Sequence, residues 1–412
     1  MIPLPVEELQ ALELGVLEGE GTVTGLRIDS RLVEPGDLFV AVRGGREFVT
    51  SARERGAVTL VPDDEHWALA AIGRLLRARS RARVVGITGS TGKTSTKDIL
   101  AALCAPVART VATEASFNAE LGVPLTLGRL EPDTELCLVE MGMRGFGQIA
   151  ELCAIARPDV GIVTAVGPVH LELVGSVEGV ARSKAELVQS LPEGGIAVVP
   201  SSPELEPFLP DGIDVRRVGE VDVDLRADGA HVAFGGGRIR FPLTSRHQAQ
   251  NALTAVTAYD ALGLPLDRVQ EGADAVELSR WRGEELPLAG GGIVVNDAYN
   301  ANPTSMRAAL EQLALRGNGR RLVAILGGMA ELGDHAERYH RELGELAREL
   351  GIEVLAVGEL ARDYGADTWV ADAASAAAAA RELVRPGDAV LVKASRSLGL
   401  EGIAPVLANR PT

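Results

Sequence analysis

The sequence contains few cysteines, and those it has are scattered. Its 412 residues include Cys104, Cys137 and Cys153, none of which lies at the spacing of a CxxC pair or of a metal-binding motif. Cysteines used in this way are typical of reduced core residues in a cytoplasmic protein. We therefore expect neither disulfide bonds nor a cysteine metal site.

Long apolar runs and a basic N-terminus are also missing. No apolar run reaches the roughly 18 residues that a membrane-spanning helix needs. The first 14 residues carry acidic side chains and no apolar core of signal-peptide length. We expect no membrane insertion, no secretory signal and a cytoplasmic location.

Positive charge is scarce as well. A formal net charge of -16 repels polyanions, so binding of nucleic acid would require a strong local basic patch. The best candidate is an arginine cluster at positions 74, 77, 79, 81 and 83, but its spacing is irregular and no aromatic residues interleave with it. We interpret the cluster as a solvated helix and linker, and we expect no nucleic-acid partner.

The residues that are present describe a folded α/β protein. The content of 46% hydrophobic and 24% charged residues is that of a globular chain, and 412 residues suffice for about three domains. Residues 1–81 contain short strand-like segments at 23–28, 38–42 and 58–61, which indicate a small N-terminal α/β domain.

Two larger α/β domains follow. In residues 82–281, apolar runs at 84–88, 136–141, 160–166 and 196–200 alternate with helical stretches, which predicts a mainly parallel sheet covered on both faces. Residues 282–412 repeat the alternation at 293–296, 322–326, 354–357 and 389–392, which predicts a Rossmann-like domain. Helices are predicted at 248–262 and 373–380. A GxGxxG fingerprint is missing, so the sequence does not support a dinucleotide site.

A glycine-rich turn follows the predicted strand 84–88, and a helix is predicted from Thr94 onward. Backbone N-H groups of such a turn can hold phosphate oxygens. Lys93 can reach the outer phosphates, and the Thr94 hydroxyl can bind Mg²⁺. Ile87 stands where the general P-loop pattern has its first glycine, so a plain glycine turn is the alternative. The predicted nucleotide-binding residues are Gly89, Ser90, Thr91, Gly92, Lys93, Thr94 and Ser95.

Lysine is rare in this chain, because the 41 basic residues include lysine only at positions 93, 97, 184 and 393. Arginine occupies nearly every other cationic position. The remaining lysines are therefore candidates for tasks that a guanidinium cannot perform, such as placing a compact ammonium on phosphate or supplying an amine that can be modified. Lys97 follows Lys93 by about one helical turn and is expected to be a surface residue.

Two further side chains lie where a parallel sheet presents its ligands. Glu140 ends the apolar strand 136–139, and a carboxylate there can hold Mg²⁺ directly or through water. His170 follows the next apolar run and is a candidate metal ligand beside Glu140. The alternatives are a glutamate that makes a loop hydrogen bond and a structural histidine.

These residues stand among motifs whose order is more specific than any one of them. The chain resembles the Mur ligases of bacterial cell-wall synthesis, most closely the MurF type, over essentially its whole length. The matching motifs are DSR at 29–31, PGDLFVA at 35–41, GSTGKTS at 89–95, the segment 118–124, VEMG at 139–142, HLE at 170–172, SKAE at 183–186, Arg246-His247 with Asn251, NDAYNANP at 296–303, MAELG at 329–333 and KASR at 393–396.

The resemblance implies a three-domain, ATP-dependent ligase that forms an amide bond. Residues 1–81 would bind the UDP-sugar peptide, residues 82–281 would bind ATP, and residues 282–412 would close over the nucleotide. ATP would phosphorylate the terminal carboxylate of a UDP-N-acetylmuramoyl-tripeptide, and the amine of D-alanyl-D-alanine would attack the acyl phosphate. The products would be the UDP-linked pentapeptide, ADP and phosphate. We expect the chain to be a monomer.

The resemblance also implies roles for single residues. Lys93 would contact the outer phosphates, while Thr94 and Glu140 would hold one Mg²⁺. His170 would hold a second Mg²⁺, supported by Lys184 after carbamylation by CO₂, which arginine could not undergo. The remaining implied contacts are Asn251 with the adenine, Asp297 with the ribose, Arg282 with the γ-phosphate, and Asp29, Ser30, Arg31 and Asn118 with the UDP-sugar substrate.

The chain departs from the MurF pattern at a few positions. Ser116 and Ala119 replace asparagines beside Asn118, Gln248 replaces an asparagine, and Ala394 replaces a glycine. Two alternative functions remain. The related ligase that adds the third peptide residue usually carries an Asp-Asn-Pro-Arg motif, which is missing here. A non-catalytic nucleotide-binding regulator would need the glycine-rich turn but not Lys184 or His170.

Overall fold

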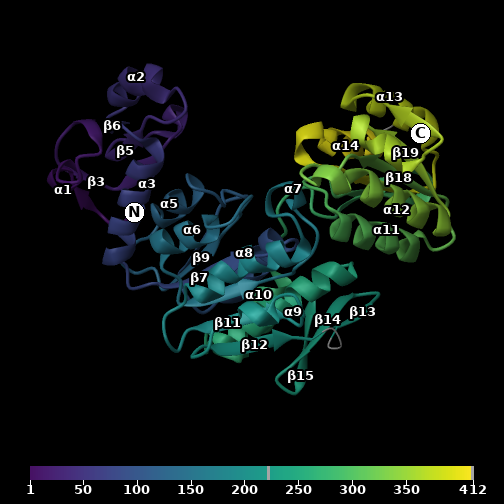
Figure 1. Ribbon diagram of the computed structural model, residues 1–412, viewed down its shortest axis with the longest axis horizontal. Coiled ribbons are helices and arrows are strands. Elements are labelled where there is room, and N and C mark those ends of the chain that lie inside the picture. Colours follow the sequence, from purple (N-terminus) through teal and green to yellow (C-terminus); the bar gives the residue numbers. More distant parts are fainter. Residues whose placement is uncertain (220–222, 410–412) are drawn as a thin grey trace.

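The computed structural model describes residues 1–219 and 223–409, and these form three lobes, each built on one of the larger sheets (Figure 1). Residues 220–222 and 410–412, which fall inside the expected domains 82–281 and 282–412, lie outside the described part. The N-terminus belongs to the lobe at one end of the molecule and the C-terminus to the lobe at the other. Within the described residues, no helix is long and apolar enough to cross a membrane.

The N-terminal lobe contains a four-stranded mixed sheet in the order β2-β6-β5-β4. β2 pairs antiparallel with β6, whereas β5 is parallel to both of its neighbours. The predicted strand 23–28 is two strands, because β3 pairs with β1 and β4 pairs with β5. The elements of this lobe are β1 Leu4–Pro5, α1 Val6–Gln10, β2 Gly15–Glu18, β3 Thr22–Val23, β4 Gly25–Arg27, β5 Asp37–Val40, α2 Val49–Glu54, β6 Val58–Pro62 and α3 Glu65–Arg79.

α3 joins this lobe to the next one. Its buried Leu69, Ile72 and Leu76 belong to the same apolar cluster as Leu127 of α5 and Leu152 of α6. The arginine cluster on this helix is not uniformly solvated. Only 13% of the Arg77 side chain is exposed, and its guanidinium donates to the carbonyl oxygen of Ala156 at 2.8 Å, because the helix packs against the central lobe at this point.

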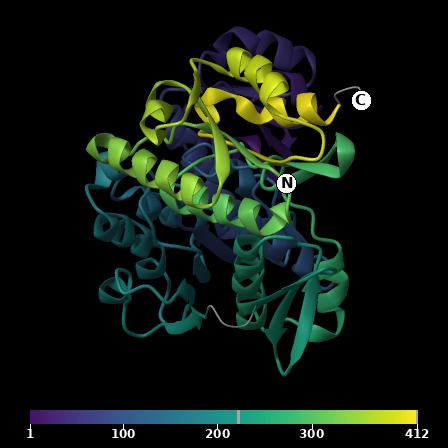
Figure 2. The ribbon, with the colours of Figure 1, turned by 90° about the vertical axis from the view of Figure 1, so that its right-hand side faces the viewer.

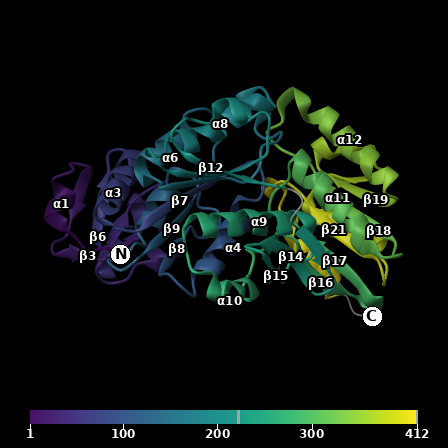
Figure 3. The same cartoon turned by 90° about the horizontal axis from the view of Figure 1, so that it is seen from below.

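The central lobe is built on a six-stranded sheet in the order β12-β11-β10-β7-β9-β8, and every pair is parallel. Helices α4 and α9 cover one face, and α6 and α8 cover the other (Figure 3). Covering on both faces explains the continuous apolar strands. The sheet and its helices are β7 Arg83–Thr88, α4 Lys93–Cys104, β8 Thr110–Ala112, α5 Gly122–Leu127, β9 Leu136–Glu140, α6 Gln148–Ala156, β10 Val160–Val163, α7 Leu171–Val174, α8 Val177–Gln189, β11 Ile196–Pro200, β12 Asp214–Val218, α9 Arg246–Ala261 and α10 Val269–Asp274.

Two features of the central lobe differ from the sequence prediction. The strand predicted at 160–166 ends at Val163, because the next residues leave the sheet and bond to the glycine-rich turn. A three-stranded antiparallel sheet was not predicted, since its strands are partly exposed and lack apolar runs. Its strands are β13 Val223–Arg226, β14 Gly229–Phe234 and β15 Gly237–Phe241, in that order across the sheet.

The C-terminal lobe, which faces the viewer in Figure 2, has a six-stranded sheet in the order β16-β17-β21-β18-β19-β20. The β16-β17 pair is antiparallel and the other pairs are parallel, which confirms the predicted Rossmann-like arrangement. Its elements are β16 Glu284–Leu288, β17 Gly292–Asn296, α11 Pro303–Gly317, β18 Leu322–Gly327, α12 Ala336–Glu349, β19 Ile352–Val357, β20 Thr368–Val370, α13 Ala373–Leu383, β21 Ala389–Lys393 and α14 Ile403–Ala408.

Candidate active site

The glycine-rich turn connects β7 to α4, as the sequence predicts. Gly89 and Gly92 have φ angles of 149° and 81°, values that disfavour any residue with a Cβ atom. A Cβ atom on Gly92 would also overlap the side-chain oxygen of Asn251, so the predicted adenine contact lies directly against the turn. α4 has no side-chain cap at Gly92, which leaves its first N-H groups available to an anion.

The segment that follows β10 braces this turn. Thr164 Oγ1 donates to the carbonyl oxygen of Thr91 at 2.5 Å, and Ser90 N donates to that of Ala165 at 2.8 Å. Ser90 Oγ also bonds with the backbone of Gly167 at 3.0 Å. These bonds fix the turn in one conformation before any ligand binds.

Lys93 lies folded over the turn, where its Nζ donates to the carbonyl oxygen of Gly89 at 2.7 Å. Burial lowers the pKa of Lys93, the Glu140 carboxylate opposes that shift, and the Arg282 charge adds to it. An anion bound in the turn would compensate both the burial and the neighbouring cation. The lysine is therefore placed to bind phosphate.

Thr94, Asn118, Glu140 and Arg282 meet in one hydrogen-bonded group beside the turn. Thr94 Oγ1 donates to Glu140 Oε2 at 2.8 Å, and Asn118 Nδ2 donates to Glu140 Oε1 at 2.7 Å. Arg282 Nη2 donates to Thr94 Oγ1 at 2.8 Å. The structure thus joins four predicted site residues that lie as much as 188 positions apart in the chain.

The chemistry of this group fits Mg²⁺ and phosphate. Glu140 is only 1% exposed, and a carboxylate next to a threonine hydroxyl offers the hard oxygen ligands that Mg²⁺ prefers. Arg282 Nε is buried without a hydrogen-bond partner, which is costly unless an acceptor binds there. The described residues contain no cluster of three His, Cys, Asp or Glu side chains that could hold a metal. Mg²⁺ needs none, since one or two protein ligands with phosphate and water suffice.

His170 and Lys184 both lie near enough to Lys93 to be affected by its charge. Lys184, on α8, is 2% exposed, and burial together with the charge of Lys93 lowers its pKa well below the usual value. Burial also lowers the pKa of His170. The Glu331 carboxylate opposes this shift through its charge and hydrogen bond, and the charge of Lys184 adds to it. The charge of Lys184 acts on His170, and the charge of Lys93 acts on both, so the structure brings these two predicted residues close to each other and to Lys93.

Glu331, which the sequence analysis did not single out, approaches this group from the C-terminal lobe. Its Oε2 lies in hydrogen-bond contact with His170 Nδ1, and its Oε1 lies 3.5 Å from Arg144 Nε. Its presence in the MAELG motif was the available signal, but only the tertiary structure places it against His170.

Asp297 follows β17 and is paired with Lys393, whose Nζ lies 2.6 Å from Asp297 Oδ2. Lys393 also donates to the carbonyl oxygen of Asn300 at 3.0 Å, and its side chain is 3% exposed. The predicted ribose contact therefore has a cationic partner that the sequence analysis did not assign. The scarcity of lysine and the place of Lys393 in the KASR motif were the available signals for it.

Lys97 contradicts the sequence prediction, since it is buried rather than on the surface. Its Nζ donates to the carbonyl oxygens of Thr113 and Ala115 at 2.6 and 3.3 Å, and it lies 3.0 Å from Asp98 Oδ1. Helical spacing from Lys93 could not reveal these partners, because two of them come from the segment after β8.

Asp29, Ser30 and Arg31 lie apart from this group, in the N-terminal lobe. Asp29 Oδ1 accepts from Arg31 N at 3.0 Å, and Asp29 Oδ2 lies 2.6 Å from Arg31 Nη2. The hydrogen bond to the Arg31 side chain is the main cause that lowers the pKa of Asp29 to about 2.

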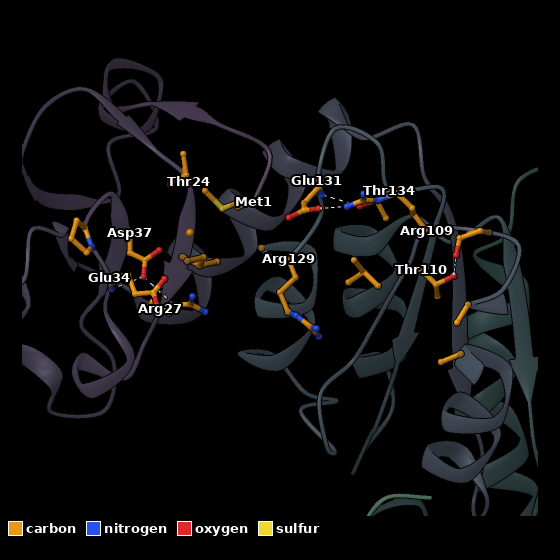
Figure 4. A pocket seen from close by; sticks show the side chains of 18 of the residues that line it. Met1, Thr24, Arg27, Glu34, Asp37, Arg109, Thr110, Arg129, Glu131 and Thr134 are labelled. Carbon is orange, nitrogen blue, oxygen red and sulfur yellow. Dashed lines mark hydrogen bonds and ion pairs between the residues drawn. The ribbon is translucent and has the colours of Figure 1, made fainter. Parts of the chain in front are cut away.

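A cavity of about 860 Å³ separates the N-terminal and central lobes (Figure 4). Ala101 and Ala105, at the far end of α4 from the glycine-rich turn, line it. α4 spans about 18 Å, so this cavity is distinct from the phosphate site. Its arginines are paired with acidic residues, namely Arg27 with Asp37 at 3.0 Å, Arg109 with Glu131 at 2.6 Å and Arg129 with Glu114 at 3.3 Å.

Comparisons with known proteins agree on one family. Residues 87–259 match the Mur ligase middle domain, and residues 281–396 match the Mur ligase, glutamate ligase domain. The UDP-N-acetylmuramoyl-tripeptide–D-alanyl-D-alanine ligase of Synechocystis is 33% identical, with 95% of this chain and 93% of the relative covered. The ligase of the same name from Escherichia coli K12 is 31% identical over the whole of both chains.

Solved structures lead to the same family. A crystal structure of MurF from Acinetobacter baumannii superposes with a TM-score of 0.86 at 27% identity, covering 99% of both chains. MurF ligase from Thermotoga maritima, in complex with ADP, gives a TM-score of 0.81 at 27% identity, covering 94% of this chain and 97% of the other. The chain therefore belongs to the Mur ligase family, within its MurF branch.

Proposed function

We propose that this protein joins D-alanyl-D-alanine to a UDP-N-acetylmuramoyl-tripeptide at the expense of ATP. Relatives that carry this name match the chain over nearly its full length, and a MurF neighbour was solved with ADP. The observation that carries the proposal is the group of Lys93, Thr94, Glu140 and Arg282, which joins a phosphate-binding turn to an unpaired, buried guanidinium nitrogen.

The reaction has two balanced steps. A carboxylate oxygen of the tripeptide attacks the γ-phosphorus, the bond to the bridging oxygen breaks, and ADP leaves with that electron pair. The amine nitrogen of D-alanyl-D-alanine then attacks the acyl carbon, a C-N bond forms, and phosphate leaves. An incoming ammonium loses two protons, one of which is carried away on hydrogen phosphate and one released to solvent.

The chain's own residues position these groups and neutralise their charge. A carboxylate that attacks a phosphate brings two anions together, so catalysis requires positive charge and fixed geometry. Lys93 lies over the turn, and Arg282 Nε, which has no partner, faces the same group. The Mg²⁺ ions, when bound, supply the further positive charge.

Two Mg²⁺ ions are part of the proposal. Thr94 and Glu140 would hold one, while His170 and a carbamylated Lys184 would hold the second. Burial and the charge of Lys93 favour the neutral amine of Lys184, and that amine is the form that adds CO₂ with release of one proton. The resulting carbamate would replace a buried neutral amine with an anion beside His170.

The other assignments follow the three lobes. We assign UDP-sugar binding to residues 1–81 with Asp29, Ser30, Arg31 and also Asn118, ATP binding to residues 82–281 with Asn251, and nucleotide closure to residues 282–412 with Asp297. We propose a monomer in the cytoplasm, where the free and buried Cys104, Cys137 and Cys153 would stay reduced. The ligase that adds the third residue is not favoured, since the nearly full-length relatives reported above carry the D-alanyl-D-alanine name.

A phosphate-release assay tests the proposal. Release from ATP should require both a UDP-N-acetylmuramoyl-tripeptide and D-alanyl-D-alanine, with single amino acids as the control nucleophiles. Release that ignores the dipeptide, or that a diamino acid with a UDP-dipeptide supports equally well, would refute the assignment.

A further inference from the structure

Glu331 has an unusual place in the molecule. It lies in the loop after β18, at the carboxyl edge of the C-terminal sheet, and its carboxylate contacts His170 of the central lobe. Both residues have left-handed backbone conformations, with φ angles of 63° and 52°. Non-glycine residues rarely adopt the left-handed conformation, because it costs free energy. Glu331 and His170 both adopt it where the two lobes meet, which indicates that the surrounding structure maintains their contact.

The loop that carries Glu331 is fixed on both sides. Met329 N donates to His340 Nε2 at 2.9 Å, and Ala330 N donates to Ser395 Oγ at 3.0 Å. The Glu331 carbonyl oxygen accepts from Glu172 N at 3.4 Å. These bonds hold the carboxylate at a defined point above the central lobe, as a binding group requires.

The charge around this point is otherwise mostly positive. Lys93 and Arg282 lie at the proposed phosphate site, and Arg144 Nε lies 3.5 Å from Glu331 Oε1. Both Glu140 oxygens accept hydrogen bonds, from Thr94 and Asn118, and Glu140 would hold Mg²⁺ in the proposed function. Glu331 also has two partners, but the Arg144 side chain is 74% exposed and lies 3.5 Å away, so an ammonium can take its place. An incoming ammonium would be repelled by the cations, and Glu331 is the carboxylate that the C-terminal lobe offers it.

We propose that Glu331 binds the ammonium of the incoming dipeptide and holds its nitrogen beside the acyl phosphate. The inference rests on the proposed function and adds to it the residue that receives the second substrate. Glu331 contacts His170, whose pKa is lowered by the charge of Lys93, so the carboxylate lies on the side of the C-terminal lobe that meets the proposed phosphate site. The role is binding and orientation of the amine, and proton transfer is not part of it.

Substitution Glu331→Gln tests this role, because it preserves the shape of the side chain and removes its charge. Loss of a hydrogen bond to a charged group should raise the KM for D-alanyl-D-alanine by about 10- to 100-fold. The KM values for ATP and for the UDP-tripeptide should stay within about twofold of the wild-type values. Glu331→Asp, which retains the charge, should recover part of the loss.

Hydroxylamine provides a readout that a purely structural role would not produce. It is uncharged near neutral pH and traps acyl phosphates as hydroxamates, so it needs no carboxylate partner. Glu331→Gln should form hydroxamate at close to the wild-type rate while amide formation falls. Glu172→Gln, an exposed carboxylate near the same contact, is the matched control and should behave as wild type in both assays.

The outcomes are separable. An unchanged KM for the dipeptide in Glu331→Gln, or equal losses of hydroxamate and amide, would overturn the inference and leave the proposed function intact. If Glu331→Gln does not fold, the same comparison is made with Glu331→Asp, for which equal losses again overturn the inference. A wild-type protein whose phosphate release ignores the dipeptide would overturn the proposed function and this inference with it.

Discussion

Replacement of Lys97 by methionine should destabilise the central lobe strongly. Methionine has a similar length and no charge, so the change removes the ammonium and retains most of the apolar stem. It leaves the carbonyl oxygens of Thr113 and Ala115 without their donor. It also leaves the Asp98 carboxylate, which is 12% exposed, without its cation.

The magnitude follows from the burial of the pair. Removal of one partner of a buried ion pair costs about 3 to 5 kcal/mol, because the other charge stays in a poorly solvated site. That is a large fraction of the typical stability of about 5 to 15 kcal/mol. In a lobe of about 200 residues, each kcal/mol lowers Tm by about 2 to 4 °C, so Tm should fall by about 6 to 20 °C.

Calorimetry of the wild type, Lys97→Met, Asp98→Asn and the double variant measures this effect. The double variant should recover part of the lost Tm, since it no longer buries an unpaired carboxylate, and the cycle isolates the pairwise term. A fall of less than about 2 °C in Lys97→Met would refute the reasoning. Lys97 also holds the segment 113–115 in place, and this segment leads to Asn118 and its bond to Glu140. The KM for the UDP-tripeptide should therefore rise as well.

Two further predictions concern the lysine of the second metal site and the cysteines. Lys184→Ala should be nearly inactive in phosphate release and partly rescued by small carboxylic acids, because these replace the carbamate. Lys184→Arg should be inactive with or without them. Normal turnover of Lys184→Arg would exclude a carbamate. Burial raises the pKa values of Cys104, Cys137 and Cys153 to about 12, so at pH 8 only about one thiol in ten thousand is ionised. A thiol-specific disulfide reagent should therefore label the native protein very slowly and should react with three equivalents after denaturation. Rapid labelling of the folded protein would contradict this prediction.

The apolar strands of the two larger sheets could be predicted because each strand is buried on both faces. The runs at 84–88 and 389–392 contain mostly apolar side chains, and the structure places both in parallel sheets. β13, β14 and β15 were missed, because a partly exposed antiparallel sheet leaves no apolar run to detect. The strand predicted to end at residue 166 ends at Val163, because Thr164 forms a hydrogen bond to the glycine-rich turn and the chain leaves the sheet there. The apolar pattern of the sequence contains no signal for that bond.

The site was predictable where its chemistry is local. The glycine-rich turn, Lys93 and Thr94 are adjacent in the chain, and the strand-turn-helix order alone indicates a phosphate site. Pairings across the molecule could not be predicted in this way. Glu331 meets His170 only where two lobes pack together, and Lys393 meets Asp297 only because β21 and β17 pair within the C-terminal lobe.

The sequence by itself determined the α/β class, the glycine-rich turn between a strand and a helix and, through the order of its motifs, the MurF branch. Those properties depend on local spacing and on the alternation of strands and helices. The tertiary structure alone decided that Lys97 is buried, that Arg282 reaches Thr94, and that Glu331 meets His170. The physical reason is that burial and charge pairing depend on which surfaces pack together, both within a lobe, as at Lys97, and between lobes, as at Glu331.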